Sequence, residues 1–168
     1  MVKKINLAVV GSGYWGSKLT GEYMHVHEEN PDFNFRGVID NDQEKLEGLR
    51  KKYRLESSKL FSNIDQCLAD PSVNAIHIAT PMETHCELAC DALSKHKHIL
   101  LEKPMATNAR DAFEIAMMAE KNGSVVLVGH IFRFNAALSR AKELIERNAI
   151  GSVKSLTFNW LDYLNYSR

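Results

Sequence analysis

A glycine-rich segment near the start of the chain holds the residues best suited to chemistry. The apolar run 5–10 leads directly into Gly-Ser-Gly-Tyr-Trp-Gly at residues 11–16, and a helix-forming stretch follows. In a G-x-G-x-x-G turn between a strand and a helix, the first glycine allows a tight turn and the second lets the backbone approach a pyrophosphate. The third lets the helix pack closely, and the free N–H groups at the helix start attract phosphate. The alternative is a turn that only connects a strand to a helix.

An acidic residue at the end of the next expected strand supports dinucleotide binding over a bare turn. The strand-like stretch 33–39 ends on Asp40, which stands 24 residues after Gly16. This is close to the ~20 residues that separate a dinucleotide-binding glycine motif from the acid that holds the adenosine ribose. A carboxylate there accepts hydrogen bonds from the ribose hydroxyls and repels a 2′-phosphate. Asp40 therefore favours NAD over NADP.

A second group of chemically capable residues, Glu102-Lys103-Pro104, follows the expected strand 98–101. Ligands of open α/β sheets bind at the carboxyl ends of the strands, which is where this group stands. A lysine in that place can hydrogen-bond a substrate hydroxyl or carbonyl, and Pro104 can hold the turn, a cis peptide bond being one way to do so. The residues equally fit a strand end that carries a solvated lysine and a stop signal.

Strands and helices alternate along the chain in the way that these sites require. Continuous apolar strands followed by helices predict an α/β fold with a doubly wound parallel sheet of the Rossmann type. Strands are expected at 5–10, 33–39, 59–61, 73–79, 98–101 and 124–128, and helices at 14–29, 43–53, 64–69, 83–95 and 108–121. A further helix at 136–147 and a strand at 153–161 come last.

Composition and charge exclude several classes of protein. The chain has 168 residues, of which 45% are hydrophobic and 25% charged, as is usual for a globular protein. Basic and acidic residues both number 21, so no net field favours nucleic acid or an anionic membrane. No apolar run approaches the ~20 residues that span a bilayer, and the apolar stretch near the start is too short for a signal peptide. We expect a cytoplasmic protein with no nucleic-acid or membrane partner.

The three cysteines predict reduced, buried thiols and no metal site. Their number is odd, and Cys86 and Cys90 stand four residues apart on one expected helix, which suits a disulfide poorly. A metal site at these two thiols would need further ligands nearby.

Taken together and in order, these motifs resemble the glucose–fructose oxidoreductase / inositol dehydrogenase (Gfo/Idh/MocA) family. The resemblance runs over essentially the whole chain, and it rests on the glycine loop, Asp40, Ala79-Thr80-Pro81 with His85, Glu102-Lys103-Pro104 and Gly-His-Ile-Phe-Arg-Phe-Asn at 129–135. It implies an NAD-dependent dehydrogenase that moves a hydride between nicotinamide and a hydroxyl-bearing carbon of a sugar, cyclitol or nucleotide sugar. Tyr14-Trp15, together with the 130–135 segment, looks most like the branch that acts on nucleotide-linked amino sugars. Ala136 departs from the proline that the family often has there.

The resemblance also implies roles for single residues. Lys103 would be the catalytic residue that polarises or deprotonates the substrate hydroxyl. The cofactor would contact Gly11, Gly13, Tyr14, Trp15, Gly16, Asp40, Thr80, Pro81, His85, Glu102, Lys103, His130 and Arg133.

Structural roles remain open for several of these residues. Tyr14 and Trp15 could pack the first helix, and His85 could cap its helix or be solvated. His130 and Arg133 could pair with acids at a domain junction.

The family pattern predicts two domains. Its members are roughly twice as long and carry a second domain with an open sheet, which offers a surface for homo-oligomers. We expect a dinucleotide-binding domain at 1–128, and at 129–168 the start of an incomplete C-terminal α+β domain for substrate and oligomer contacts. The expected strand 153–161 would then lack a neighbour and leave apolar side chains such as Val153, Leu156, Phe158 and Trp160 uncovered. The alternative function is a non-catalytic dinucleotide-binding module or a truncated remnant.

Overall fold

The computed structural model describes residues 4–159, which fall into two units that divide between Gly129 and His130. The first unit contains the sheet and five α-helices, and the second contains a short 3-10 turn, Ile131–Phe134, and one α-helix, α6 (Ala136–Glu146). No helix within the described residues is long and apolar enough to cross a membrane.

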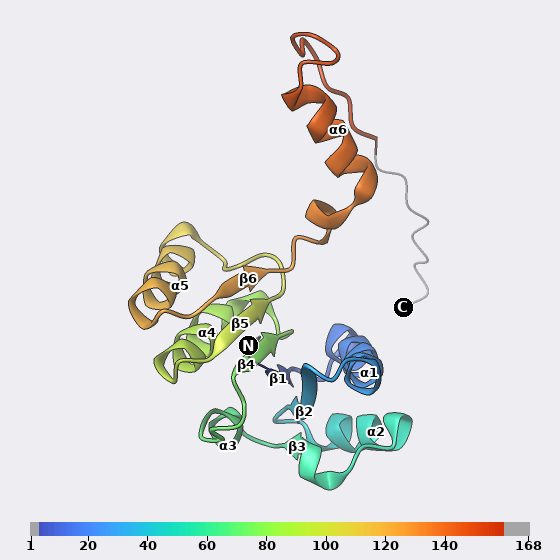
Figure 1. The fold of residues 1–168 in the computed structure, drawn as a ribbon. Helices are drawn as coiled ribbons and strands as arrows, with labels where there is room; N and C mark the ends of the chain where they lie inside the picture. The colour runs from blue at the N-terminus through green and yellow to red at the C-terminus, as the bar shows by residue number, and fades with distance from the viewer. Residues whose placement is uncertain (1–3, 160–168) are drawn as a thin grey trace. The chain divides into compact units, whose positions relative to one another are not determined.

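Six parallel strands form one sheet in the order β3-β2-β1-β4-β5-β6 (Figure 1). The strands are β1 (Ile5–Val10), β2 (Phe33–Ile39), β3 (Leu60–Phe61), β4 (Ala75–Ile78), β5 (His98–Leu101) and β6 (Val126–Val128). The chain builds outward from β1 to β3 and then crosses back to place β4 on the other side of β1. This reversal confirms the doubly wound parallel sheet, and it places a topological switch point between β1 and β4.

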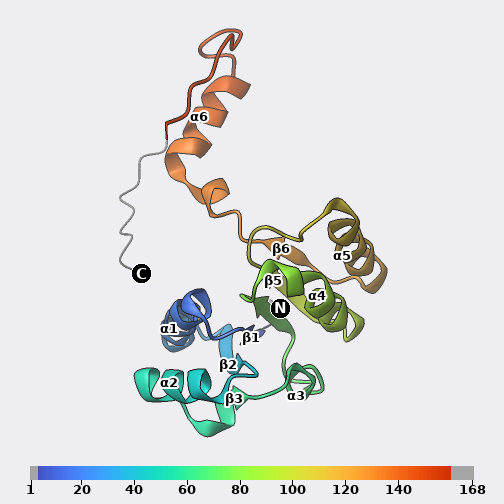
Figure 2. The same cartoon turned by 180° about the vertical axis from the view of Figure 1, so that it is seen from behind.

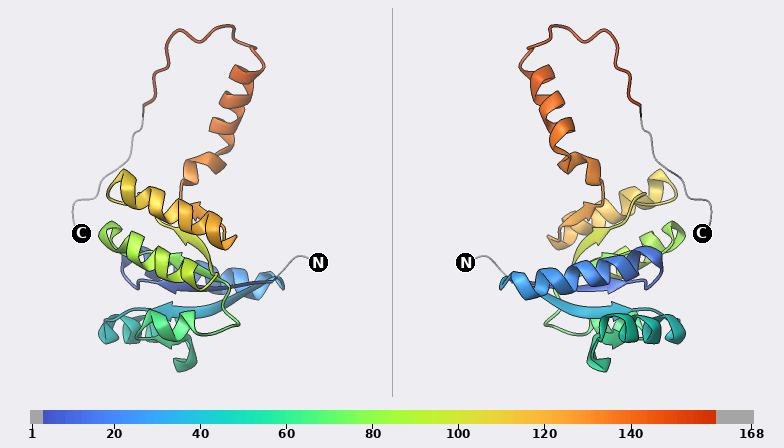
Figure 3. Two further views of the ribbon diagram at one scale, coloured as in Figure 1. Left: turned by 90° about the vertical axis from the view of Figure 1, so that its left-hand side faces the viewer. Right: turned by 90° about the vertical axis from the view of Figure 1, so that its right-hand side faces the viewer.

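Helices cover both faces of the sheet. They are α1 (Tyr14–Glu29), α2 (Gln43–Tyr53), α3 (Ile64–Leu68), α4 (His85–Ser94) and α5 (Ala109–Asn122). The opposite views of Figures 1 and 2 agree that α1 and α2 lie on one side and α3, α4 and α5 on the other, and Figure 3 shows each group face-on.

The strand β4 shows how the two faces are filled. Ile76 and Ile78 point into the cluster formed with α4 and α5, where Leu93 and Ile115 are fully buried. Ala75, which directly precedes Ile76 on β4, belongs to the cluster on the opposite face, with residues of β1, β2 and α2. Because side chains alternate along a strand, a strand covered on both faces is apolar throughout.

A β-bulge interrupts the pairing of β1 with β2. Leu7 pairs with Phe35 and Ala8 pairs with Gly37, so Arg36 is one extra residue on β2. Gly37 has φ +147°, and a Cβ there would collide with the backbone carbonyl of Lys59. Only glycine fits this position, and the extra residue sets which side chain ends β2 beside the glycine loop.

The structure shortens several expected elements and corrects one. The strand expected at 73–79 covers Ala75–Ile78, the strand expected at 124–128 covers Val126–Val128, and the helix expected from 83 begins as a 3-10 turn, Met82–Thr84. The strand expected at 153–161 is wrong over 153–159, where the backbone is irregular. A strand needs a partner for its backbone groups, and none pairs with this stretch within residues 4–159. The remainder of that expected strand, with Trp160, lies outside the described residues.

Candidate functional site

The carboxyl ends of the strands bring the expected site residues of the first unit to one edge of the sheet. Backbone hydrogen bonds carry the pairing into the loops: Gly11 N donates to Ile39 O at 2.8 Å, Ala79 N to Val10 O at 2.8 Å and Glu102 N to Ile78 O at 3.0 Å. The glycine loop, Asp40, Thr80-Pro81 and Glu102-Lys103 therefore follow neighbouring strands. This is the edge of an open α/β sheet at which ligands bind.

The three glycines of the loop have different reasons to be glycine. Gly11 has φ +98°, and a Cβ there would lie 2.8 Å from the carbonyl oxygen of Ala79. A Cβ on Gly16 would overlap the carbonyl of Gly11, which shows how closely α1 packs on the turn. Gly13 has an ordinary φ of −63°, and nothing lies within 4 Å of the place of its missing Cβ. The fold requires Gly11 and Gly16, whereas Gly13 keeps open space above the backbone.

The start of α1 has no side-chain cap. Its N-cap residue, Gly13, supplies no side-chain hydrogen bond, and the first turn has no acidic residue. By contrast, α2, α3, α5 and α6 begin with side-chain caps from Asp42, Asn63, Asn108 and Asn135. The start of α1 thus lacks both a capping side chain and an acidic residue, and its positive dipole end suits a negatively charged ligand.

Asp40 is tied to the glycine loop. Its Oδ2 accepts from the backbone N–H of Ser12 at 2.7 Å and from the Ser12 hydroxyl at 2.6 Å, and its Oδ1 accepts from Asp42 N at 2.9 Å. Partial burial would raise the pKa of the Asp40 carboxyl, but these hydrogen bonds outweigh burial and lower it. A carboxylate has about four lone-pair sites, so one remains for a ligand hydroxyl.

Tyr14 and Trp15 point away from the core. Their exposed fractions are 49% and 55%, and their rings meet edge to face with centroids 5.5 Å apart. The ammonium of Lys18 lies 4.4 Å from the centroid of the Tyr14 ring. The two rings contact each other and Lys18 of α1, so a role in packing the first helix stays open beside a role in cofactor binding.

His85 is turned inward. It is 1% exposed, with Nδ1 2.9 Å from the carbonyl oxygen of Pro104 and Nε2 3.0 Å from that of Thr80. The alternative of a solvated helix-end histidine is therefore wrong. The ring instead joins the loop after β4 to the loop after β5, while the Thr80 hydroxyl bonds that of Thr84 at 2.7 Å.

The segment after β5 presents Lys103 to solvent. Lys103 is exposed, its peptide bond to Pro104 is cis, and no hydrogen bond or ion pair holds its ammonium within residues 4–159. Glu102 is only partly exposed, and a Cβ built on Gly129 would lie 3.6 Å from its Oε2. The two neighbours thus differ: Glu102 is held against the fold, and Lys103 is available.

Sequence reasoning missed two polar residues beneath this edge. The Tyr23 hydroxyl of α1 lies 2.7 Å from His77 Nδ1 of β4, and His77 Nε2 lies 3.5 Å from Glu102 Oε1. The signal was a histidine, His77, between two isoleucines of the apolar stretch 73–79, and its partner on α1 is 54 residues away.

His130 and Arg133 belong to the second unit, where both are exposed. His130 precedes the 3-10 turn, and its carbonyl accepts from Arg133 N at 3.0 Å. The side chain of Asn135 then caps α6.

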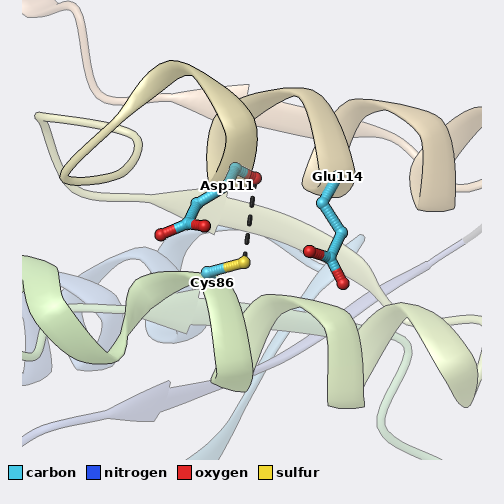
Figure 4. A group of neighbouring side chains, drawn as sticks. All are labelled: Cys86, Asp111 and Glu114. Atoms are coloured by element: carbon cyan, nitrogen blue, oxygen red, sulfur yellow. Dashed lines mark hydrogen bonds between the residues drawn. The ribbon is translucent and has the colours of Figure 1, made fainter.

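The cysteines are all free thiols, and Cys67 is the fully buried one. Cys86 is half-buried and faces Asp111 and Glu114 of α5, the three donor atoms lying within 4.8 Å of one another (Figure 4). Its Sγ contacts the carbonyl oxygen of Asp111 at 3.7 Å, and the Asp111 carboxylate accepts from Asn108. Burial raises the pKa of the Cys86 thiol, as do the two carboxylates. A protonated thiol suits the carbonyl contact better than metal ligation.

Comparison with known proteins places this geometry among oxidoreductases. A family model described as an oxidoreductase family with an NAD-binding Rossmann fold, GFO_IDH_MocA, matches residues 5–130. An uncharacterized oxidoreductase of Synechocystis is 30% identical over 163 residues, 96% of this chain and 42% of the relative. Glucose-6-phosphate 3-dehydrogenase of Bacillus subtilis is 35% identical over 120 residues, 71% of this chain and 33% of the relative.

Solved structures share the fold. GenD2 from gentamicin A biosynthesis, in complex with NAD, superimposes with a TM-score of 0.75 at 28% identity, covering 89% of this chain and 41% of that one. The chain thus spans about two fifths or less of the length of the relatives that it matches.

Proposed function

This chain belongs to the Gfo/Idh/MocA oxidoreductase family, whose members have an NAD-binding Rossmann fold. On that premise we propose that the chain is an NAD-dependent dehydrogenase or the N-terminal, NAD-binding part of one. The reaction moves a hydride between nicotinamide and a hydroxyl-bearing carbon of a sugar, cyclitol or nucleotide sugar. Two similar proteins support this class: the relative called glucose-6-phosphate 3-dehydrogenase, and GenD2, whose solved structure contains NAD.

One observation carries the dinucleotide site. Gly13 has an ordinary backbone conformation with empty space where a side chain would stand. The fold itself does not require glycine there, but a pyrophosphate approaching the backbone does. The uncapped start of α1 supplies N–H groups at the same place. The residues present therefore fit the phosphates of a dinucleotide.

Asp40 would select NAD. Its carboxylate lies at the end of β2, ionised and oriented by Ser12 and Asp42. It can accept a ribose hydroxyl, whereas a 2′-phosphate would bring a second negative charge against it. Tyr14 and Trp15, exposed beside the loop, and Thr80 and Pro81, after β4, would line the rest of the cofactor site.

Lys103 is the residue proposed to act on the substrate. NAD, when bound, accepts or supplies the hydride. The exposed side chain of Lys103 at the end of β5 would hydrogen-bond the substrate oxygen. As a neutral amine it would take the hydroxyl proton when the substrate is oxidised, and as an ammonium it would return that proton when the substrate is reduced. Glu102 would stand beside it as a fixed carboxylate. The buried ring of His85 would keep the loop after β4 next to the loop after β5, through the carbonyl oxygens of Thr80 and Pro104.

The second unit would contribute to a second domain. We propose that the dinucleotide-binding domain covers 1–128 and that 129–168 begin a domain for substrate and oligomer contacts. His130 and Arg133 follow β6 directly in sequence and would contact the cofactor from there. Homo-oligomers would form through the sheet of that second domain.

Titration with NADH and NADPH tests the cofactor site, using the full 168-residue chain and calorimetry. We expect tighter binding of NADH, and a loss of at least ~10-fold in affinity, about 1.4 kcal/mol, for Gly13→Val. The matched control is Gly48→Val, since Gly48 also has nothing within 4 Å of its missing Cβ but lies on α2. Unchanged NADH affinity in Gly13→Val would refute the site. Equal affinity for NADPH in the wild type would refute the role of Asp40.

Turnover tests Lys103. In a version of the protein that also has the second domain of its relatives, with NAD and a panel of phosphorylated sugars and cyclitols, Lys103→Ala should lower the rate by ~10²-fold or more. This is the size usual for a lost acid–base group. NADH affinity should stay nearly unchanged. A variant with normal turnover would give Lys103 a structural role.

A further inference from the structure

Three polar side chains from three elements form a row beneath the carboxyl edge of the sheet. Tyr23 comes from α1, His77 from β4 and Glu102 from the end of β5. The Tyr23 hydroxyl lies 2.7 Å from His77 Nδ1, and His77 Nε2 lies 3.5 Å from Glu102 Oε1. His77 is 2% exposed, so its ring sits within the fold, whereas the Glu102 side chain, 24% exposed, reaches the surface.

Strand register explains why these residues meet. His77 pairs with Leu100 on β5, and Glu102 follows two residues later on the same face. On the other side, the Tyr23 ring stacks on Phe33 with centroids 5.5 Å apart and on Phe35 at 6.3 Å. Tyr23 is thus fixed by packing, and it meets the His77 ring edge-on.

The protonation states decide which atom donates. Burial lowers the pKa of His77 to about 4, so the ring is neutral at pH 7. Burial and the negative charge of Glu102 raise the pKa of Tyr23 to about 12, so its hydroxyl keeps its proton. A neutral imidazole donates from one nitrogen and accepts at the other. A carboxylate can only accept, whereas a tyrosine hydroxyl can donate, so the proton belongs on Nε2.

The hydrogen bond with Tyr23 accounts for Nδ1 of the His77 ring but not for Nε2. The strand partners of His77 are Val9 and Leu100, and all four residues of β4 are buried. His77 Nε2 has no close hydrogen-bond partner among the described residues, Glu102 being the nearest acceptor. Burying a polar atom in this way costs about 1–3 kcal/mol unless it is paired. The position therefore retains a polar ring for what it does to Glu102.

We propose that His77, oriented by Tyr23, is a positioning residue that directs its Nε2–H toward Glu102, 3.5 Å away, and attracts that carboxylate into its place next to Lys103. The meaning of this for catalysis rests on the proposed function, in which Lys103 acts on the substrate. A buried imidazole stands at each end of the turn: His77 Nε2 lies 3.5 Å from Glu102 Oε1, and His85 Nδ1 lies 2.9 Å from the carbonyl oxygen of Pro104. Lys103 stands between these two residues.

The tautomer of His77 tests the proposal directly. In the ¹⁵N-labelled 168-residue chain, long-range ¹H–¹⁵N NMR at pH 7 should show neutral His77 with its proton on Nε2. Glu102→Ala should remove this preference and populate both tautomers, because Tyr23 can either donate or accept. Tyr23→Phe should leave the proton on Nε2, because Glu102 still accepts it. A merely structural histidine would not change tautomer with Glu102.

Two results would overturn the proposal: a wild-type His77 with its proton on Nδ1, or an unchanged Nε2–H preference in Glu102→Ala. The wild-type measurement needs no variant to fold. NADH titration of the same sample separates the two hypotheses. A chain with the Nε2–H tautomer and no NADH affinity refutes the proposed function alone, and a chain that binds NADH with the Nδ1–H tautomer refutes the positioning role alone.

Discussion

Two helices of 11 residues, α2 in the first unit and α6 in the second, begin alike and are buried very differently. Each starts with an Asx cap, Asp42 for α2 and Asn135 for α6. Leu46 and Leu49 of α2 are buried in the sheet cluster, while α6 has no buried residue. The comparison shows that capping and composition are sufficient to place a helix in the sequence, whereas its stability depends on what covers it.

Ion pairs between charged side chains do not make up for the missing buried contacts of α6. Glu143 of α6 accepts a hydrogen bond from Arg140 at 2.6 Å and forms an ion pair with Arg147 at 2.8 Å, and such exposed pairs contribute little to stability. The second unit also leaves large apolar side chains uncovered, among them Ile131, Phe134 and Leu156, at 70%, 77% and 78% exposure. Local interactions shape this unit, and tertiary packing stabilises the first.

Hydrogen exchange should show the largest difference between the units. Amides of β1 and β4 open only with global unfolding, whereas amides of α6 belong to a short helix without buried residues, so they should exchange at least ~10²-fold faster. NMR-detected exchange measures this, with α2 as the control of equal length. Equal exchange rates for the amides of α2 and α6 would contradict the difference between the two units, because α6 would then have to be packed against another part of the protein.

Matched truncations should differ by several kcal/mol. Leu93 is fully buried between α4 and the sheet, so Leu93→Ala should lower the free energy of unfolding of the first unit by about 2–5 kcal/mol. Ile145 on α6 is 41% exposed, and Ile145→Ala should cost about 0.5 kcal/mol or less. Urea denaturation measures both. Similar losses would mean that the two units unfold as one.

The carboxylates of the two units should differ in their response to pH. The pKa of Asp40 is lowered in the folded state, so its contribution to stability is present above its unfolded pKa of about 3.9 and disappears as the pH falls through the lower folded value. Asp40→Asn should cost about 1–2 kcal/mol at pH 7 and almost nothing once the pH has fallen below the folded pKa of Asp40. Glu143→Gln on α6 should leave the unfolding of the first unit unchanged. A pH-independent effect of Asp40→Asn would contradict the hydrogen-bonded carboxylate.

The smallest effect concerns helix propensity. Gly48 lies exposed on α2 with nothing within 4 Å of its missing Cβ, so Gly48→Ala should raise the stability of the first unit by about 0.5–1 kcal/mol. Ser139→Ala, at an exposed position of α6, makes a similar gain in helix propensity and should not move the unfolding midpoint of the first unit. Thermal denaturation compares them. A shift in both would contradict their independence.

The sequence was sufficient for the sheet and its edge because those features depend on local patterns. Apolar runs such as 73–79 predict strands, and the glycine motif, Asp40 and Glu102-Lys103 each follow one directly, so parallel pairing brings them together. Right-handed crossovers limit how the strands can be arranged, but the order β3-β2-β1-β4-β5-β6 comes from the structure. The structure confirms this doubly wound sheet.

What the sequence could not predict depends on contacts between distant residues. His85 looked like a helix-end histidine, but its ring turns inward because two backbone carbonyls from separate loops await it. His77 passed as one more residue of a buried strand, since its partners stand far away on α1 and after β5. The strand expected at 153–161 failed for the opposite reason: the apolar pattern is present and no partner strand is, within the described residues.

The bulge in β2 bears on how chain length can vary in such a fold. Arg36 has no partner on β1, while the pairs on either side, Leu7 with Phe35 and Ala8 with Gly37, are each in step. Elsewhere in a sheet, losing one residue turns every later side chain to the opposite face. Here a deletion of Arg36 would remove the bulge and leave the pairs on both sides of it, Leu7 with Phe35 and Ala8 with Gly37, in one continuous register. Asp40 would keep its place beside Ser12. The number of residues between the glycine motif and its acid can therefore vary, and strand pairing locates the acid more reliably than counting residues does.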